Sequence, residues 1–226
     1  GFSDVRIFAE PGSIVPEGYN ATYRKKQYGD WTNWATAFYE LLLSEPDTDL
    51  FLMIEDDIIL CRMTKEYLEY SIPQLGEFAS VSPYTPSKLK RRNIVGFHNE
   101  SRGIQTWSTQ AVVMTRQKAI CFFSDYDVQR HRFENVFGKD EKYWCLPYTD
   151  SKNSIKDVVI GHWAAKNNLP IYYHTPSLVE HIGYHSTLTD MKTTVENSRK
   201  SADFVGENYD LSEWMKSPIK VAKLTS

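Results

Sequence analysis

The chain has 226 residues, of which 41% are hydrophobic and 24% charged, and its formal net charge is −3. This length suits one substantial domain or at most two small ones, and the composition is that of a soluble globular protein rather than a disordered or fibrous one. The weak negative charge argues against nucleic acid as a partner, and no apolar stretch approaches the roughly 20 residues that cross a bilayer. The three cysteines lack metal-type spacing and imply no disulfide framework.

The first third of the chain alternates between strand and helix patterns. Residues 4–10, DVRIFAE, predict a short strand that ends in a turn. Residues 30–46 carry apolar side chains at helical spacing, with Asp30 placed to cap, and predict an amphipathic helix. Residues 49–55, DLFLMIE, form a continuous apolar run, which is typical of a strand covered on both faces. A second helix is predicted over 64–75.

The rest of the chain predicts further strands and two helices in mixed order. Strands are expected at 78–84, 93–97, 103–107, 110–115, 170–176 and 177–183, and helices at 116–125 and 154–169. We therefore expect one α/β domain over 1–226, built as a three-layer sandwich around a mixed, mostly parallel sheet of about six strands. The polar segment 190–226 is expected to form a helical tail.

Three consecutive acids, Glu55, Asp56 and Asp57, follow the predicted buried strand. Adjacent carboxylates repel one another, and their burial is costly unless a cation meets them. In open α/β sheets, ligands bind at the carboxyl ends of the strands, and carboxylate oxygens are the ligands that Mg²⁺ or Mn²⁺ prefers. One interpretation is a metal site, with Asp57 just beyond a central strand, and the other is a solvated strand end.

Several segments resemble the nucleotide-sugar-dependent glycosyltransferases of the GT-A fold. The pattern W-x-N-W-x-x-A at 31–37 precedes IEDDI at 54–58, as the corresponding helix precedes the acidic motif in those enzymes. The segment PSLVEHIGYHSTL at 176–188 is similar to the signature PSL-x-QH-x-G-x-HSSL of the N-acetylglucosaminyltransferase IV family. KDVVIGHW at 156–163 resembles the D-W-L-L-D helix of that family. The matching blocks keep their order over roughly residues 30–190.

The resemblance implies a GT-A (Rossmann-like) fold and a metal-dependent, inverting transfer of a sugar from a UDP-sugar to a glycan or other hydroxyl acceptor. It implies that Asp57 binds the divalent cation, Mn²⁺ or Mg²⁺, that bridges the donor diphosphate. His181 is expected to be a second ligand to the metal or the diphosphate, and His185 is the alternative. Asp56 is expected to contact the donor sugar, or the metal through water, and Glu55 the ribose.

Asp157 is the candidate general base, because an inverting transferase needs a carboxylate to take the proton of the acceptor hydroxyl. The alternative is that an acid in a first helical turn simply complements the helix dipole. Asp150 and Glu141 are the next candidates for the base. Trp107 is expected to border the donor sugar, with core packing as the alternative.

The helix before the acidic strand and the basic segment ahead of it contribute further candidates. Asn33 is placed to reach the nucleotide, whereas Trp34 is expected to lie in the core. Arg24, Lys25 and Lys26 are interpreted as facing water rather than binding phosphate.

Two other functions stay open at this point. A sugar nucleotidyltransferase has a related α/β layout and also needs a metal, although we find no Gly-rich phosphate loop near the start. A catalytically inactive module of the same fold would bind a glycan or nucleotide without turnover. The chain begins like a second strand, so we expect an upstream strand and helix to complete the nucleotide site. The compartment stays open, with the cytoplasm favoured.

Overall fold

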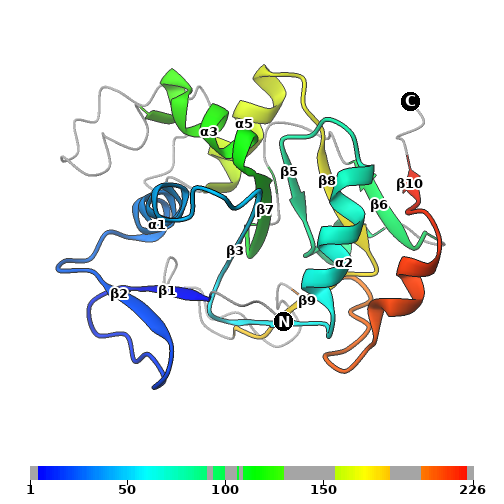
Figure 1. The fold of residues 1–226 in the computed structure, drawn as a ribbon, viewed down its shortest axis with the longest axis horizontal. Helices are drawn as coiled ribbons and strands as arrows, with labels where there is room; N and C mark the ends of the chain where they lie inside the picture. Colours follow the sequence, from blue (N-terminus) through cyan, green and yellow to red (C-terminus); the bar gives the residue numbers. More distant parts are fainter. Residues whose placement is uncertain are drawn as a thin grey trace.

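The computed structural model describes residues 5–90, 94–99, 106, 109–129, 156–183 and 200–222, and Figure 1 shows their arrangement. The α-helices are α1 (Asp30–Ser44), α2 (Thr64–Ser71), α3 (Arg116–Ser124) and α5 (Lys156–Lys166). Short 3₁₀ helices are η1 (Ile72–Gln74), η2 (Ser87–Leu89) and η5 (Leu211–Lys216). The strands are β1 (Arg6–Ala9), β2 (Asn20–Tyr23), β3 (Leu50–Ile54), β4 (Ile58–Leu60), β5 (Ser80–Ser82), β6 (Gly96–Asn99), β7 (Ala111–Thr115), β8 (Ile171–Thr175), β9 (Val179–His181) and β10 (Val221–Ala222). None of the helices in these ranges is both long and apolar enough to cross a membrane.

Six strands form the main sheet in the order β10-β6-β8-β5-β7-β3, so the α/β class with a mixed sheet is confirmed. Within this sheet, β10–β6 and β5–β8 are parallel, whereas β3–β7, β5–β7 and β6–β8 are antiparallel. The expectation of a mostly parallel sheet is therefore wrong. Parallel neighbours need a long crossover, usually a helix, and the described residues between β5 and β7 contain only η2 and β6.

The strand that precedes the acids lies at one end of this sheet. Within the described residues, β3 pairs with β7 alone, from Leu50 opposite Thr115 to Ile54 opposite Ala111. This position contradicts the central place expected for the strand. A continuous apolar run indicates that both faces of a strand are covered. It does not indicate how many neighbouring strands pair with that strand.

Helices cover both faces of the main sheet (Figure 1). Phe51 and Met53 of β3 belong to a hydrophobic cluster that they share with α1, α3 and α5. Leu50 and Leu52 point the other way and pack, as residues of β4 do, against a second cluster, which includes residues of α2, β9 and η5. Because successive side chains of a strand alternate between faces, β3 is covered on both sides, as its apolar run predicted. Trp34 of α1 lies in the first cluster, which confirms its place in the core.

Two short sheets flank the main one. β1 pairs in parallel with β2, which the sequence did not predict, and β4 pairs antiparallel with β9. The helix α1 begins at Asp30, but Gly29 occupies the cap position and no side chain caps this end. The prediction that Asp30 caps the helix is therefore wrong. The Asp30 carboxylate forms an ion pair with Lys156 instead.

Candidate metal site

The pairing of β4 with β9 brings together two residues that are far apart in the chain. Asp57 immediately precedes β4, and His181 is the last residue of β9, where it lies opposite Ile58. The amide of Ile182 donates to the carbonyl of Asp57 at 2.8 Å and extends this ladder. Beside this end of the ladder, His181 Nε2 lies 3.1 Å from Asp57 Oδ2.

Glu55 completes a group of three potential metal ligands. One side-chain ligand atom each of Glu55, Asp57 and His181 lies within 4.8 Å of the other two. The amide of Glu55 donates to the carbonyl of Gln110 at 3.0 Å, which continues the β3–β7 pairing one residue past the strand. Asp56 is exposed and lies outside this group.

The donor set suits a divalent cation. Two carboxylates and an imidazole are ligands that Mn²⁺ accepts, whereas Mg²⁺ prefers oxygen ligands alone. His181 Nε2 is the ring nitrogen that faces Asp57 Oδ2, so it is the one placed to share a cation with that carboxylate. The residues present could therefore hold the cation that the sequence predicted.

Gly183 lies directly against the Asp57 carboxylate. A Cβ atom added at Gly183 would lie 2.0 Å from Asp57 Oδ2, 2.9 Å from its Cγ and 3.1 Å from His181 Cε1. Real Cβ atoms do not approach other atoms so closely, so a side chain here would have to displace the carboxylate. The glycine after β9 is thus a steric requirement of the Asp57–His181 geometry.

A buried lysine joins Glu55 to the start of α1. Lys156 Nζ lies 2.6 Å from Glu55 Oε1 and 2.7 Å from Asp30 Oδ1, and its side chain is only 5% exposed. Burial alone would lower the pKa of Lys156, but the charges of Glu55 and Asp30 and their hydrogen bonds outweigh it, so the pKa is raised. The amine therefore stays protonated at neutral pH and compensates the two carboxylates.

Sequence reasoning missed Lys156, although a local signal was present. It is the first residue of α5, and a cation is unfavourable next to the positive end of a helix. A lysine at that position is better explained by acidic partners elsewhere in the fold, which only the tertiary structure identifies.

Asp157, the candidate base, lies in the first turn of α5. Its Oδ1 accepts hydrogen bonds from Thr106 Oγ1 at 3.0 Å and from the amide of Thr109 at 3.3 Å. The amide of Thr106 also donates to the backbone carbonyl of Asp157 at 3.3 Å. Asp157 is partly exposed and does not belong to the three-ligand group, but its neighbour Lys156 contacts that group through Glu55.

Asn33 is engaged within the protein through both ends of its amide. Nδ2 donates to the carbonyl of Phe8 at 3.0 Å, and Oδ1 accepts from Arg24 Nε at 2.8 Å. Arg24 is buried, contrary to the expectation that it faces water, whereas Lys25 and Lys26 are exposed. The remaining sequence candidates lie outside the described residues: Trp107, Glu141, Asp150 and His185.

Comparison with known proteins adds no relative. No protein-family model and no curated protein matches this chain.

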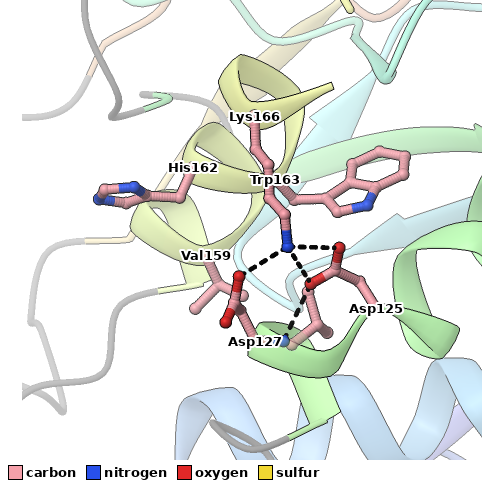
Figure 2. Close-up of a pocket in the computed structure, with 7 residues that line it drawn as sticks. Asp125, Asp127, Val159, His162, Trp163 and Lys166 are labelled. Carbon is pink, nitrogen blue, oxygen red and sulfur yellow. Dashed lines mark hydrogen bonds and ion pairs between the residues drawn. The ribbon is translucent and has the colours of Figure 1, made fainter. Parts of the chain in front are cut away.

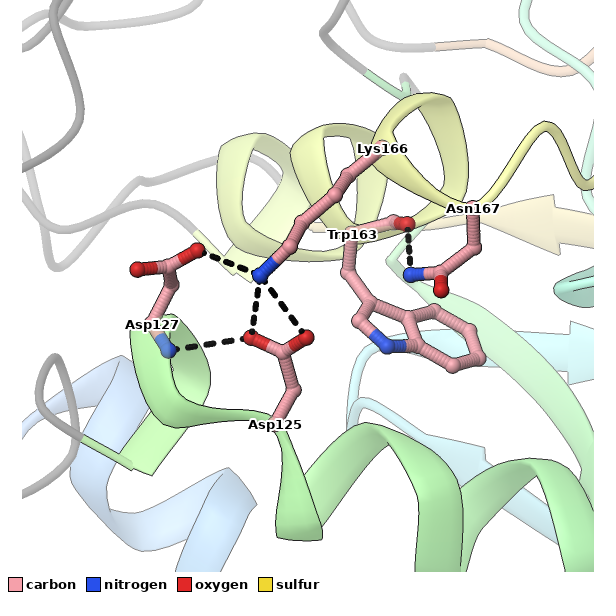
Figure 3. A network of polar contacts seen from close by, with 5 residues as sticks. All are labelled: Asp125, Asp127, Trp163, Lys166 and Asn167. Atoms are coloured by element: carbon pink, nitrogen blue, oxygen red, sulfur yellow. Dashed lines mark hydrogen bonds and ion pairs between the residues drawn. The ribbon is translucent and has the colours of Figure 1, made fainter.

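A separate small pocket lies between α5 and the turn after α3, and none of its lining residues belongs to the three-ligand group (Figure 2). Lys166 Nζ lies 2.7 Å from Asp127 Oδ2 and 3.1 Å from Asp125 Oδ2, and Figure 3 shows the amine between the two carboxylates. The acids are thus neutralised by a cation from the same protein. The lining residues are Asp125, Asp127, Val128, Val159, His162, Trp163 and Lys166.

Proposed function

We propose that this chain is a metal-dependent glycosyltransferase that moves a sugar from a UDP-sugar to a glycan or other hydroxyl acceptor. One observation carries the proposal. Asp57 and His181 come from the two sequence blocks that most resemble the glycosyltransferase motifs, and the fold sets them 3.1 Å apart with Glu55 alongside. Two motifs that belong to one site in those enzymes also meet at one site here.

Asp57, His181 and Asp157 have separate roles in this proposal. Asp57 and His181 hold the cation, and Mn²⁺ is favoured over Mg²⁺ because one ligand is an imidazole. When bound, the cation neutralises the diphosphate and so stabilises the charge on the departing nucleotide. Asp157 accepts the proton of the acceptor hydroxyl as that oxygen attacks the sugar from the opposite face, with inversion.

At the level of the α/β class, the architecture is compatible with a GT-A-type domain. A mixed six-stranded sheet carries helices on both faces, and the acids follow directly after one of its strands. Ligand sites of α/β proteins lie at such strand ends.

A titration of UDP tests the cation dependence of donor binding. We expect calorimetry to detect UDP binding in Mn²⁺ and none in chelator, because carboxylates facing a diphosphate repel it without a cation. Asp57→Asn and His181→Ala should each abolish the Mn²⁺-dependent binding. Asp47→Asn is the matched control, since Asp47 is an exposed acid in the loop before β3, and it should bind as the wild type does. Equal UDP affinity in chelator and in Mn²⁺ contradicts the proposal.

Donor hydrolysis separates a transferase from a binding module. A transferase loses some sugar to water in the absence of acceptor, so incubation with Mn²⁺ and UDP-sugars should release free sugar and UDP. Binding of UDP with no release from any UDP-sugar tested favours the binding module.

A further inference from the structure

Lys156 connects three parts of the chain at the candidate metal site. It belongs to α5, and its amine contacts Asp30 at the start of α1 and Glu55 just after β3. Glu55 is also one of the three potential cation ligands. A single buried ammonium group is thus shared between a structural carboxylate and a carboxylate of the site.

The surroundings of Lys156 exclude a direct role in binding substrate. The residue is 4% exposed, and both of its ion pairs are shorter than 3 Å. Two of the three N–H donors of this amine already bind carboxylates, and bringing a phosphate to the buried third would carry a high desolvation cost. Lys156 therefore acts on the site through Glu55.

Lys156 lowers the net negative charge near the candidate metal site. Asp30, Glu55 and Asp57 together carry three negative charges, and Lys156 offsets one of them. The attraction of a divalent cation to the site scales with the net charge it meets. With Lys156 in place, one oxygen of Glu55 is occupied, and the field at the site is weaker than three carboxylates alone would produce.

We propose that Lys156 tunes the cation affinity of the site, so that a divalent cation alone binds weakly and the site fills mainly when an anionic diphosphate shares the cation. This inference rests on the proposed function for the identity of the anion. In this role Lys156 is a positioning residue that governs the coupling between cation binding and nucleotide binding. Lys156 takes no part in the chemical step.

The test compares Lys156→Met with Lys166→Met. Lys166 lies on the same helix and also bridges two carboxylates, but none of these residues belongs to the candidate metal group (Figure 3). Calorimetry with MnCl₂ alone should give a Kd about tenfold or more lower for Lys156→Met than for the wild type, because a buried positive charge is gone and Glu55 is released. The ratio of the Mn²⁺ Kd without UDP to that with UDP should fall by a similar factor. Lys166→Met should match the wild type in both quantities.

Thermal unfolding gives a second readout that needs no activity. Without cation, Lys156→Met should unfold at a lower temperature than the wild type, because it leaves two carboxylates uncompensated. Mn²⁺ should then raise the unfolding temperature of Lys156→Met by more than that of the wild type. A merely structural lysine would leave the cation affinity unchanged or lowered, so tighter binding identifies the tuning role.

The outcomes separate the two proposals. An unchanged or higher Mn²⁺ Kd in Lys156→Met overturns the inference about Lys156, while Mn²⁺-dependent UDP binding by the wild type keeps the proposed function. If the wild type does not bind UDP in Mn²⁺, the proposed function is wrong. The titration with Mn²⁺ alone still tests the inference about Lys156. Should Lys156→Met fail to fold, Lys156→Gln removes the same positive charge, and its amide can still donate hydrogen bonds to Asp30 and Glu55. That variant should also bind Mn²⁺ more tightly, and an unchanged Kd overturns the inference.

Discussion

His181 Nε2 lies 3.1 Å from Asp57 Oδ2, at the end of the β4–β9 pairing in which His181 lies opposite Ile58. A shift of one residue in this pairing would turn the imidazole to the other face of the ribbon. The pairing thus brings the two residues close without help from a cation. His181 lies on a paired strand, and ligands on strands are positioned more precisely than ligands on loops.

Gly183→Ala should damage the candidate metal site more than the fold. The new methyl group would meet Asp57 Oδ2 at 2.0 Å, so the carboxylate must move away from His181. We expect Mn²⁺-dependent UDP binding to weaken by about tenfold or more, on the scale of a displaced metal-site residue. Calorimetry measures the affinity and circular dichroism the fold. Ile182→Ala, which alters an exposed neighbouring side chain, is the control, and unchanged binding by Gly183→Ala would contradict the steric argument.

Local pattern predicted the elements well where the hydrophobic signal was long. The apolar run at 49–55 became β3, and the amphipathic segment at 30–46 became α1. β2 has the sequence NATY and β4 is three residues long, so neither gave a clear signal. Strand order was mispredicted because it depends on partners that are distant in sequence, which local pattern does not specify.

The site was predicted in part. Resemblance placed Asp57 and His181 at one site, and the structure brings them together. It did not indicate Lys156, because the partners of a buried charge are found through tertiary contacts. Arg24 was expected in water, since arginine is rarely buried without partners, but its partners come from four separate positions along the chain.

Arg24→Lys should destabilise the protein although it keeps the charge. The guanidinium lies over the rings of Phe8 and Tyr28, with its carbon 5.2 and 5.4 Å from their centroids, and it also bonds Asn33 and Glu40. Lysine cannot reproduce the planar stacking or the fork of donors. We expect urea denaturation to show a loss of about 1–3 kcal/mol in the free energy of unfolding.

Lys25→Ala is the control for Arg24→Lys. Lys25 is the next residue and is exposed, so the free energy of unfolding of this variant should stay within about 0.5 kcal/mol of the wild type. Equal stability of Arg24→Lys and the wild type would show that charge alone, and not stacking, holds β2 against α1.

Acid should destabilise the fold through His174. This residue is completely buried, its Nδ1 donates to the carbonyl of Pro176 at 2.7 Å, and its Nε2 accepts from the Tyr67 hydroxyl at 2.9 Å. Burial lowers the pKa of His174 to about 4 from an ordinary value of 6.5. The unfolded chain therefore takes up the proton first, so stability is complete above pH 6.5 and falls as the pH drops towards 4. The total loss from this group is about 3 kcal/mol.

Urea unfolding at pH 7, 5.5 and 4 measures this loss. The double variant Tyr67→Phe with His174→Phe removes the titrating group and the hydroxyl that it accepts from. Its free energy of unfolding should fall less steeply with acid than that of the wild type, by about the same 3 kcal/mol. Parallel pH profiles for the two proteins would mean that His174 does not control acid stability.

Asp157→Asn and Asp57→Asn should have opposite effects if the proposed roles are correct. The amide oxygen of an asparagine at 157 can still accept from Thr106 and Thr109, so the local structure should persist while the proton-accepting carboxylate is lost. Transfer by Asp157→Asn should fall by roughly 10²-fold or more, with Mn²⁺-dependent UDP binding within about twofold of the wild type. Asp57→Asn should lose UDP binding first.

Thr106→Val separates a catalytic from a structural role for Asp157. It removes the hydroxyl that donates to Asp157 Oδ1 and keeps the carboxylate, so a catalytic Asp157 should retain most of its transfer rate in this variant. If Asp157 only anchors the start of α5, Thr106→Val should lower the stability, because it removes one of the anchoring hydrogen bonds, and Asp157→Asn should keep both its stability and its transfer rate. Urea unfolding and transfer rates on the same preparations distinguish these cases. Intact transfer in Asp157→Asn would rule out this base and direct the search to Asp150 or Glu141.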